Sequence, residues 1–110
     1  MKCMAALALA LAVGLGTAAV ADTDILEELR RGEHFDRASL FGTGPDVLAR
    51  ALAGDHFSIH GLGWYFSEGL RGFPTNEDVA HRLYEAAYMR GHWPSAYELA
   101  RAAEARADSI

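Results

Sequence analysis

Residues 54–100 read GDHFSIHGLGWYFSEGLRGFPTNEDVAHRLYEAAYMRGHWPSAYELA, and this stretch decides the fold. Apolar side chains recur in it at spacings of three and four, the period of one face of an α-helix. Each apolar stretch is followed by a glycine, the residue that most readily accepts the left-handed conformation after a helix. The pattern therefore predicts two successive helices and the beginning of a third. The glycines that delimit them are Gly54, Gly69 and Gly91.

The first of these helices is expected to follow Asp55 as its N-cap and to run to about Glu68. Glycine within the helix leaves room for a neighbouring helix, so we expect close approaches at Gly63 and at the matching Ala100 of the third helix. Bulk at either position would separate the packed layers. The apolar stripe of the first helix consists of Ile59, Leu62 and Phe66.

The second helix is expected to begin at Thr75, because Thr75 and Asp78 have the spacing of a capping box, with Asp in place of the preferred Glu. It should end before Gly91. Its apolar stripe consists of Val79, Ala80, Leu83 and Ala87.

Helices are also expected on both sides of this pair, at about 24–31, from Pro45 to about 53, and from Pro94 onward. Residues 33–44 form a loop or a weak helical turn, and no strand pattern competes with these helices. The fold class predicted is all-α, with about five helices. The inner face of the last helix is expected to carry Ala96, Leu99, Ala100 and Ala103.

The sequence also repeats at an offset of 37 residues. Several matches at one offset, each at the same point of a helix pair, predict helix-turn-helix units that stack side by side as a short α-solenoid of antiparallel helix pairs. The matched pairs are Gly32 with Gly69, Gly54 with Gly91, Ser58 with Ser95, Leu62 with Leu99, Ile25 with Leu62, and Leu29 with Phe66.

The pattern over about 54–100 resembles the Sel-one-like repeat, a branch of the tetratricopeptide-type helical repeats. One full repeat is clear, at 54–91, with degenerate flanks. The residues that carry the resemblance are Leu62, Gly63, Phe66, Gly69, Phe73, Pro74, Asn76, Ala80, Leu83, Tyr84, Ala86, Ala87, Gly91, Ser95, Leu99 and Ala100. Those expected to form the repeat core are Leu62, Gly63, Phe66, Gly69, Ala80, Leu83, Ala87, Gly91 and Leu99.

The chain departs from the family pattern in the connection between the two helices, which is one residue longer than usual. Phe73 replaces the usual Val, Asn76 the usual Asp, and Leu83 the usual Trp. The resemblance implies a protein-interaction scaffold, often exported or periplasmic in bacteria, with no catalytic residues to transfer. Fold analogy alone does not assign a partner.

Residues 1–21 predict a cleaved export signal, because Lys2 precedes an apolar core that ends in the small-x-small site Ala19-Val20-Ala21. Residues 22–110 would then form one small helical-repeat domain in the periplasm or outside the cell, with no membrane span after cleavage. The only thiol, Cys3, would leave with this leader, so no disulfide or thiol chemistry is expected in the mature domain.

The charge balance, 15 acidic residues against 10 basic ones, argues against nucleic acid as a partner. The serines lack a nucleophile-elbow context, and no glycine-rich loop resembles a phosphate cradle. We therefore expect a protein without catalysis and without a cofactor.

Two helical stripes are expected to line a partner-binding surface, since Trp, Tyr and Arg commonly carry binding energy. The first runs along His56, His60 and Trp64 on one helix, and 37 residues later lie Trp93, Tyr97 and Arg101 on the last. The alternative is that Trp64 and Trp93 only cover the ends of a short array.

The sequence thus predicts an exported adaptor that binds a protein, and because the array reaches only about two and a half units, partner binding or self-association would complete it. One alternative is a small periplasmic metal-binding protein, since His56 and His60 form a His-x-x-x-His pair that His81, His92 or acidic residues would supplement. This pair lacks the adjacent Glu of the metalloprotease motif. Another alternative is an inert fragment of a longer array.

Overall fold

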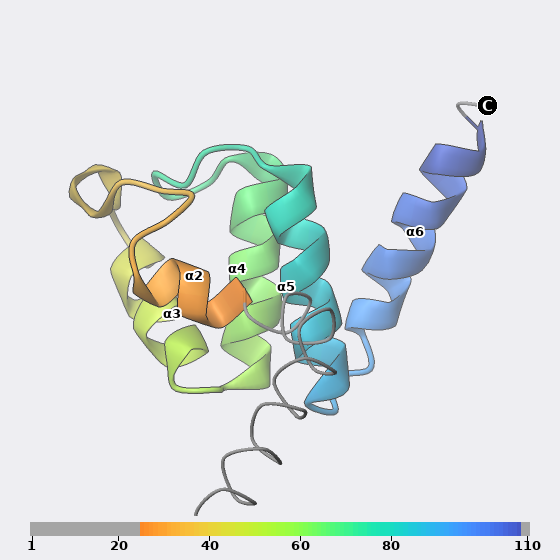
Figure 1. Ribbon diagram of the computed structural model, residues 1–110, viewed down its shortest axis with the longest axis horizontal. Coiled ribbons are helices and arrows are strands. Elements are labelled where there is room, and N and C mark those ends of the chain that lie inside the picture. Colours follow the sequence, from red (N-terminus) through yellow and green to blue (C-terminus); the bar gives the residue numbers. More distant parts are fainter. Residues whose placement is uncertain (1–24, 109–110) are drawn as a thin grey trace, which may run out of the picture.

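The computed structural model describes residues 25–108, and over these residues the predicted all-α class is confirmed (Figure 1). The predicted leader at 1–21 lies outside the described part of the chain. Within the described part, no helix is both long enough and apolar enough to cross a membrane. The helices are α2 (Ile25–Arg30), α3 (Gly44–Leu52), α4 (His56–Glu68), α5 (Glu77–Met89) and α6 (Ser95–Asp108), with a 3-10 turn at Arg37–Ser39 between α2 and α3.

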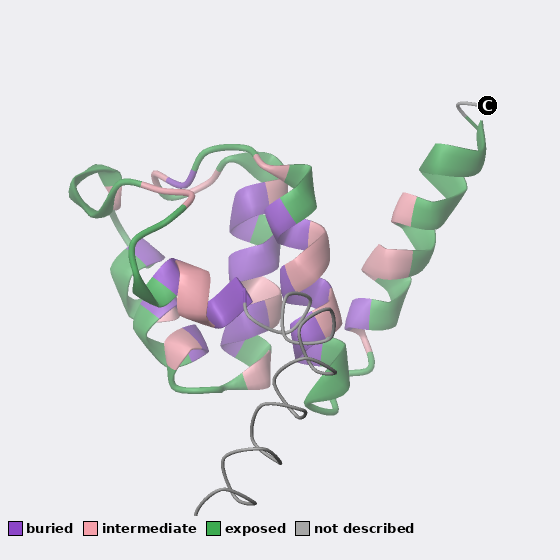
Figure 2. Ribbon diagram, in the orientation of Figure 1, coloured by how far each residue is buried: buried purple, intermediate pink, exposed green. Residues whose placement is uncertain are grey.

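Helix α4 is the centre of the structure, with α3 and α5 packed against it and the short α2 lying against α3 and α5 (Figure 1). Helix α6 packs against α5 and diverges from it toward the C-terminus. Burial follows this order, because the buried positions concentrate on α2, α4 and α5 while α6 is largely exposed (Figure 2). The largest side chains that are fully buried are those of Phe66, Ile25, Leu29, Leu48, Ile59, Leu62, Leu83 and Val79.

A close approach joins α4 to α5 at Gly63. A Cβ atom built on Gly63 would lie 2.8 Å from Cε1 of Tyr84, a side chain that is only 7% exposed. The sequence predicted a close approach at Gly63, but Ala100, its supposed counterpart, is exposed on α6. Because Gly63 has no side chain, the aromatic ring of Tyr84 on α5 packs directly against α4.

Helix α4 ends at Gly69, where the backbone turns left-handed with φ +68°. A Cβ atom at this position would also lie 2.5 Å from Oγ1 of Thr75. Gly69 and Gly91 are both exposed, so they act through the backbone of the turns and not through burial in the core.

The cap of α5 differs from the predicted one. Asn76, not Thr75, is the N-cap, and its side chain accepts a hydrogen bond from the backbone N–H of Val79 at 3.1 Å. The backbone N–H of Asn76 donates to the carbonyl of Phe66 at 2.7 Å, which ties the start of α5 to α4. This tie places the Asn side chain, one residue beyond Thr75, over the first amides of the helix.

The inner face of α6 also differs from the prediction. Ala96, Ala100 and Ala103 are exposed, and the side that packs against the rest of the chain carries Ser95, Leu99 and Ala102. Alanine fits either side of a helix, so the spacing of alanines did not determine which side is buried.

An ion pair holds α2 on α5. Arg82 donates to both carboxylate oxygens of Glu28, with a distance of 3.0 Å from Nη1 to Oε1, and His34 Nε2 lies 2.7 Å from Oε1. These hydrogen bonds, that from Arg82 first, lower the pKa of Glu28 from 4.5 to about 2. Glu28 is therefore ionised in the folded chain well below the pH at which an unfolded glutamate is protonated.

The packing at Gly63 predicts that the same substitution has opposite effects at two positions of α4. Gly63→Ala should lower the free energy of unfolding by about 1–3 kcal/mol, because the Tyr84 ring must move. Gly61→Ala should raise it by about 0.5–1 kcal/mol, because the nearest atom to a Cβ there is Val47 Cγ1 at 3.9 Å and alanine favours a helix interior. Urea unfolding of both variants measures the difference, and equal changes would contradict this packing.

Removing the charge of Glu28 should destabilise the protein at neutral pH only. Glu28→Gln is expected to lower the free energy of unfolding by about 1–2 kcal/mol at pH 7, because Arg82 loses its ionised partner. The folded pKa is about 2 and the unfolded value 4.5, so the wild type loses this stabilisation as the pH falls from 4.5 toward 2. Urea titrations at several pH values should show the two curves converging at acid pH, and a constant gap would disprove the role of the charge.

Candidate functional site

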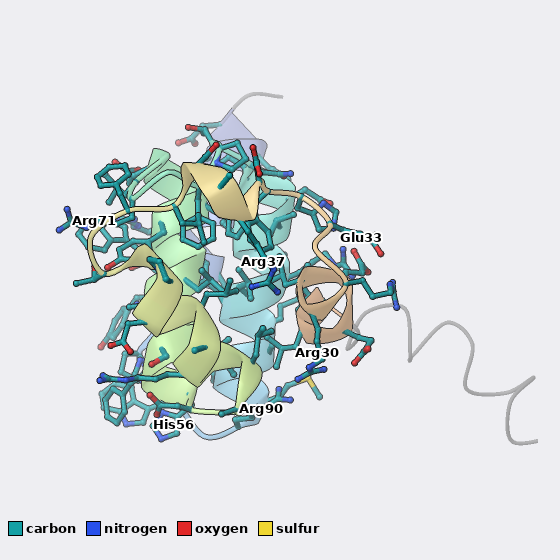
Figure 3. All side chains as sticks on the ribbon, turned by 90° about the vertical axis from the view of Figure 1, so that its left-hand side faces the viewer. Arg30, Glu33, Arg37, His56, Arg71 and Arg90 are labelled. Carbon is teal, nitrogen blue, oxygen red and sulfur yellow. The ribbon has the colours of Figure 1, made fainter. Side chains whose placement is uncertain are left out.

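Three imidazole rings gather where the start of α4 meets the connection between α5 and α6. They belong to His56, His60 and His92, named here the histidine cluster. His92 is buried, and its backbone N–H donates to the carbonyl of Ala87 at 3.0 Å, which folds the chain back after α5. Figure 3 shows His56 near the bottom of the view, at the same end of the molecule as Arg90. The cluster therefore depends on the antiparallel packing of α4 and α5, which brings the start of one helix beside the end of the other.

The contacts within the cluster are short and directional. His56 Nδ1 lies 3.0 Å from His92 Nδ1, and His60 Nδ1 lies 2.7 Å from the hydroxyl of Ser95. The ring of His92 is centred 5.1 Å from that of His56 and 4.8 Å from that of His60. A hydrogen bond between two imidazole nitrogens needs one donor and one acceptor, so His56 and His92 cannot both be protonated while it persists.

Burial is the main electrostatic influence on the cluster. It lowers the pKa of His60, and the nearby Glu98 carboxylate opposes this change. Burial also lowers the pKa of His92, the positive charges of His60 and His56 add to that effect, and Asp55 opposes it. Both rings therefore favour the neutral form in the folded protein.

Asp55 precedes the cluster and is the N-cap of α4, as predicted, although its carboxylate accepts a hydrogen bond from the Ser58 hydroxyl at 2.6 Å. That hydrogen bond is the main cause of the lowered pKa of Asp55. The start of α4 thus presents a carboxylate beside two imidazoles.

The sequence predicted His56 and His60 as a pair, and the structure gives each of them a different partner. His56 meets His92, whereas His60 meets Ser95 and packs against the ring of Tyr84, with centroids 5.1 Å apart. His92 was foreseen only as a possible supplement to the pair. The position of His92 directly after Gly91 could have indicated this contact. In an antiparallel helix pair, the end of the second helix lies beside the start of the first, where His56 and His60 are found.

The other residues predicted for partner binding are exposed. Trp93 and Tyr97 are each 65% exposed, and their rings pack together with centroids 6.2 Å apart. Trp64 is 53% exposed and packs against Tyr65 of its own helix. Phe57, which lies outside both predicted stripes, is 67% exposed and meets the ring of His92 edge-on.

A cavity of about 590 Å³ opens between α5 and the diverging α6. Arg101 lines it and pairs with Glu98 at 2.6 Å, and the buried ring of Tyr84, whose pKa burial raises to about 12, forms part of the wall. His81 Nδ1 is buried without a hydrogen-bond partner in the described part of the chain. The lining also includes Ser67, Glu77, Asp78, Ala102, Ala105 and Arg106.

A second group of possible metal ligands consists of Glu28, Glu33 and His34, whose ligand atoms lie within 4.8 Å of one another. Arg82 already occupies both oxygens of Glu28, and Arg31 pairs with Glu33 at 2.8 Å. A cation bound there would face two guanidinium groups, so this group is better explained as an ion-pair network.

Comparison of the chain with protein-family models, with curated proteins and with solved structures finds no match. The resemblance to the Sel-one-like repeat therefore depends on the residue pattern alone.

The histidine cluster predicts that stability falls in mildly acidic solution. The unfolded histidines titrate near 6.5, whereas the folded pKa values of His60 and His92 lie lower, so the unfolded chain binds more protons below that pH. The free energy of unfolding should therefore decrease as the pH drops below about 6.5, and the decrease should be smaller in His60→Gln and His92→Gln. Urea unfolding between about pH 5 and 8 measures this slope.

His81→Gln, which lies outside the cluster, is the matched control and should retain most of the wild-type slope. A slope that is unchanged in both cluster variants would refute this assignment.

Proposed function

We propose that this chain is an exported helical-repeat module without catalysis that binds a protein partner, in the manner of the Sel-one-like repeats that it resembles. In this proposal residues 1–21 are a leader, the domain works in the periplasm or outside the cell, and the helices form a short α-solenoid. Helices α4 and α5 make up its clearest unit.

Backbone geometry supports the repeat arrangement. Gly32 and Gly69, 37 residues apart, have φ values of +85° and +68°, and Gly54 and Gly91 have +95° and +93°. The proposed array would place these four left-handed turns at corresponding positions near the ends of successive helices.

Burial at matched positions gives further support. Ser58 and Ser95 are both buried, and Ile25 and Leu62 are both fully buried. Leu99 is only half-buried where its counterpart Leu62 is fully buried. This difference is what a repeat array predicts when no further helix covers α6.

The observation that carries the proposed function is the exposure of Trp93 and Tyr97 at the start of α6. Large aromatic rings that are two-thirds exposed leave apolar area in water, and such area commonly marks a protein-binding surface. Trp and Tyr are also among the residues that most often dominate binding energy. Tyr97 lies on an exposed side of α6.

Self-association is the second way to cover this surface. Repeat arrays gain stability when each unit is covered by the next, and α6 lacks such a neighbour in the described part of the chain. A second copy of the chain would serve as that neighbour. The formal net charge of −5 disfavours nucleic acid in the same role.

Site-specific photo-crosslinking tests the proposal. A photoreactive phenylalanine analogue at position 93 or 97 should give the same crosslinked protein in cells, because both rings belong to one surface. The same analogue at Arg50, an exposed residue of α3, is the control and should give no such product. Mass spectrometry then distinguishes a different protein from a second copy of this chain.

Equal products from all three positions, or no product from 93 and 97, would contradict a binding surface at the start of α6. Far-UV circular dichroism of each variant confirms that the helices are intact.

A further inference from the structure

We propose that His56 and His92 are two protein ligands of a binding site for divalent copper. This site goes beyond the proposed protein-binding function, which does not require a metal. It joins the first residue of α4 to the connection that leads into α6.

The copper site is inferred from the distance between one ring nitrogen of His56 and one ring nitrogen of His92. Nδ1 of His56 and Nδ1 of His92 are 3.0 Å apart. Imidazole nitrogens bind transition metals at about 2.0–2.1 Å, so one ion that binds both would see them at an angle of roughly 91–97°. Binding of the ion would replace the hydrogen bond between the two rings: both Nδ1 atoms would then supply lone pairs, and each ring would carry its proton on Nε2.

That angle selects among metals. It is close to the right angle between neighbouring ligands in tetragonal copper(II) and well below the tetrahedral angle that zinc adopts in protein sites. Copper(II) also binds nitrogen ligands more tightly than the other divalent first-row metals. We therefore assign the site to copper(II), with zinc as a weaker competitor.

The surroundings of the pair suit a cation with open coordination positions. The Asp55 carboxylate, which precedes His56 in the sequence and accepts a hydrogen bond from Ser58, supplies negative charge that favours a cation nearby. His60 packs against His92 while its own Nδ1 is engaged by Ser95, so it acts as a positioning residue for the His92 ring. Water would fill the remaining positions.

Copper at this place would connect α4 to the segment that presents Trp93. His92 directly precedes Trp93 in the turn between α5 and α6. An ion bound to His56 and His92 would therefore restrain that turn against the start of α4 and stabilise the folded chain.

Titration of the full chain with copper(II) tests the proposal, with Cys3→Ser in every variant so that the thiol supplies no ligand. Calorimetry should show one copper ion per chain, electron paramagnetic resonance should show nitrogen ligands, and the thermal unfolding midpoint should rise. His56→Gln and His92→Gln should each weaken binding at least tenfold, and zinc should bind more weakly than copper.

His81→Gln is the matched control, because it removes a histidine of α5 outside the histidine cluster and should leave copper affinity unchanged. Absence of binding, equal affinity in wild type and in both cluster variants, or an equal loss in His81→Gln would each overturn the proposal. Far-UV circular dichroism of every variant separates loss of a ligand from loss of the fold.

Discussion

The close approach of α4 and α5 at Gly63 and Tyr84 is the constraint on which the rest of the structure depends. A side chain at Gly63 would push the Tyr84 ring out of a place where it is almost wholly buried. Because the ring stays there, the two helices lie close along their length and the start of α4 meets the end of α5. The same ring packs against His60, which in turn packs against His92. The central packing of the domain and the geometry of the histidine cluster therefore share one aromatic side chain.

Much of the helix layout could be predicted from the sequence, since glycine marks helix ends through a backbone preference that belongs to the residue itself. The ends of α4 and α5 near Gly69 and Gly91 are of this kind. The cap of α5 was wrong because Thr75 and Asn76 are both good capping residues, and a tertiary hydrogen bond from the Asn76 backbone to Phe66 selects between them. Local propensity contains no information about that bond.

The buried face of α6 and the partners of the histidines were not predictable from spacing, for a related reason. An alanine-rich helix has no strong apolar side, so only the packing of Ser95 and Leu99 shows which face is inside. His92 lies outside any helical periodicity, in a turn, and its neighbours are set by the antiparallel arrangement of α4 and α5. The spacing along α4 places His56 and His60 on one face of the helix. It does not show that His56 contacts His92 while His60 contacts Ser95.

Helix α6 is attached to the domain mainly through its first turns, and its exposure increases toward Asp108. Segments with few buried contacts open at a free-energy cost well below that of global unfolding, so amide exchange along α6 should be fastest in its last turns. Helix α6 is anchored at its start by the buried Ser95, and its later residues Ala105 and Arg106 line the cavity beside α5. A molecule that occupied this cavity would contact α5 and α6 together, and its binding would offset the entropic cost of holding the end of α6 in a single position.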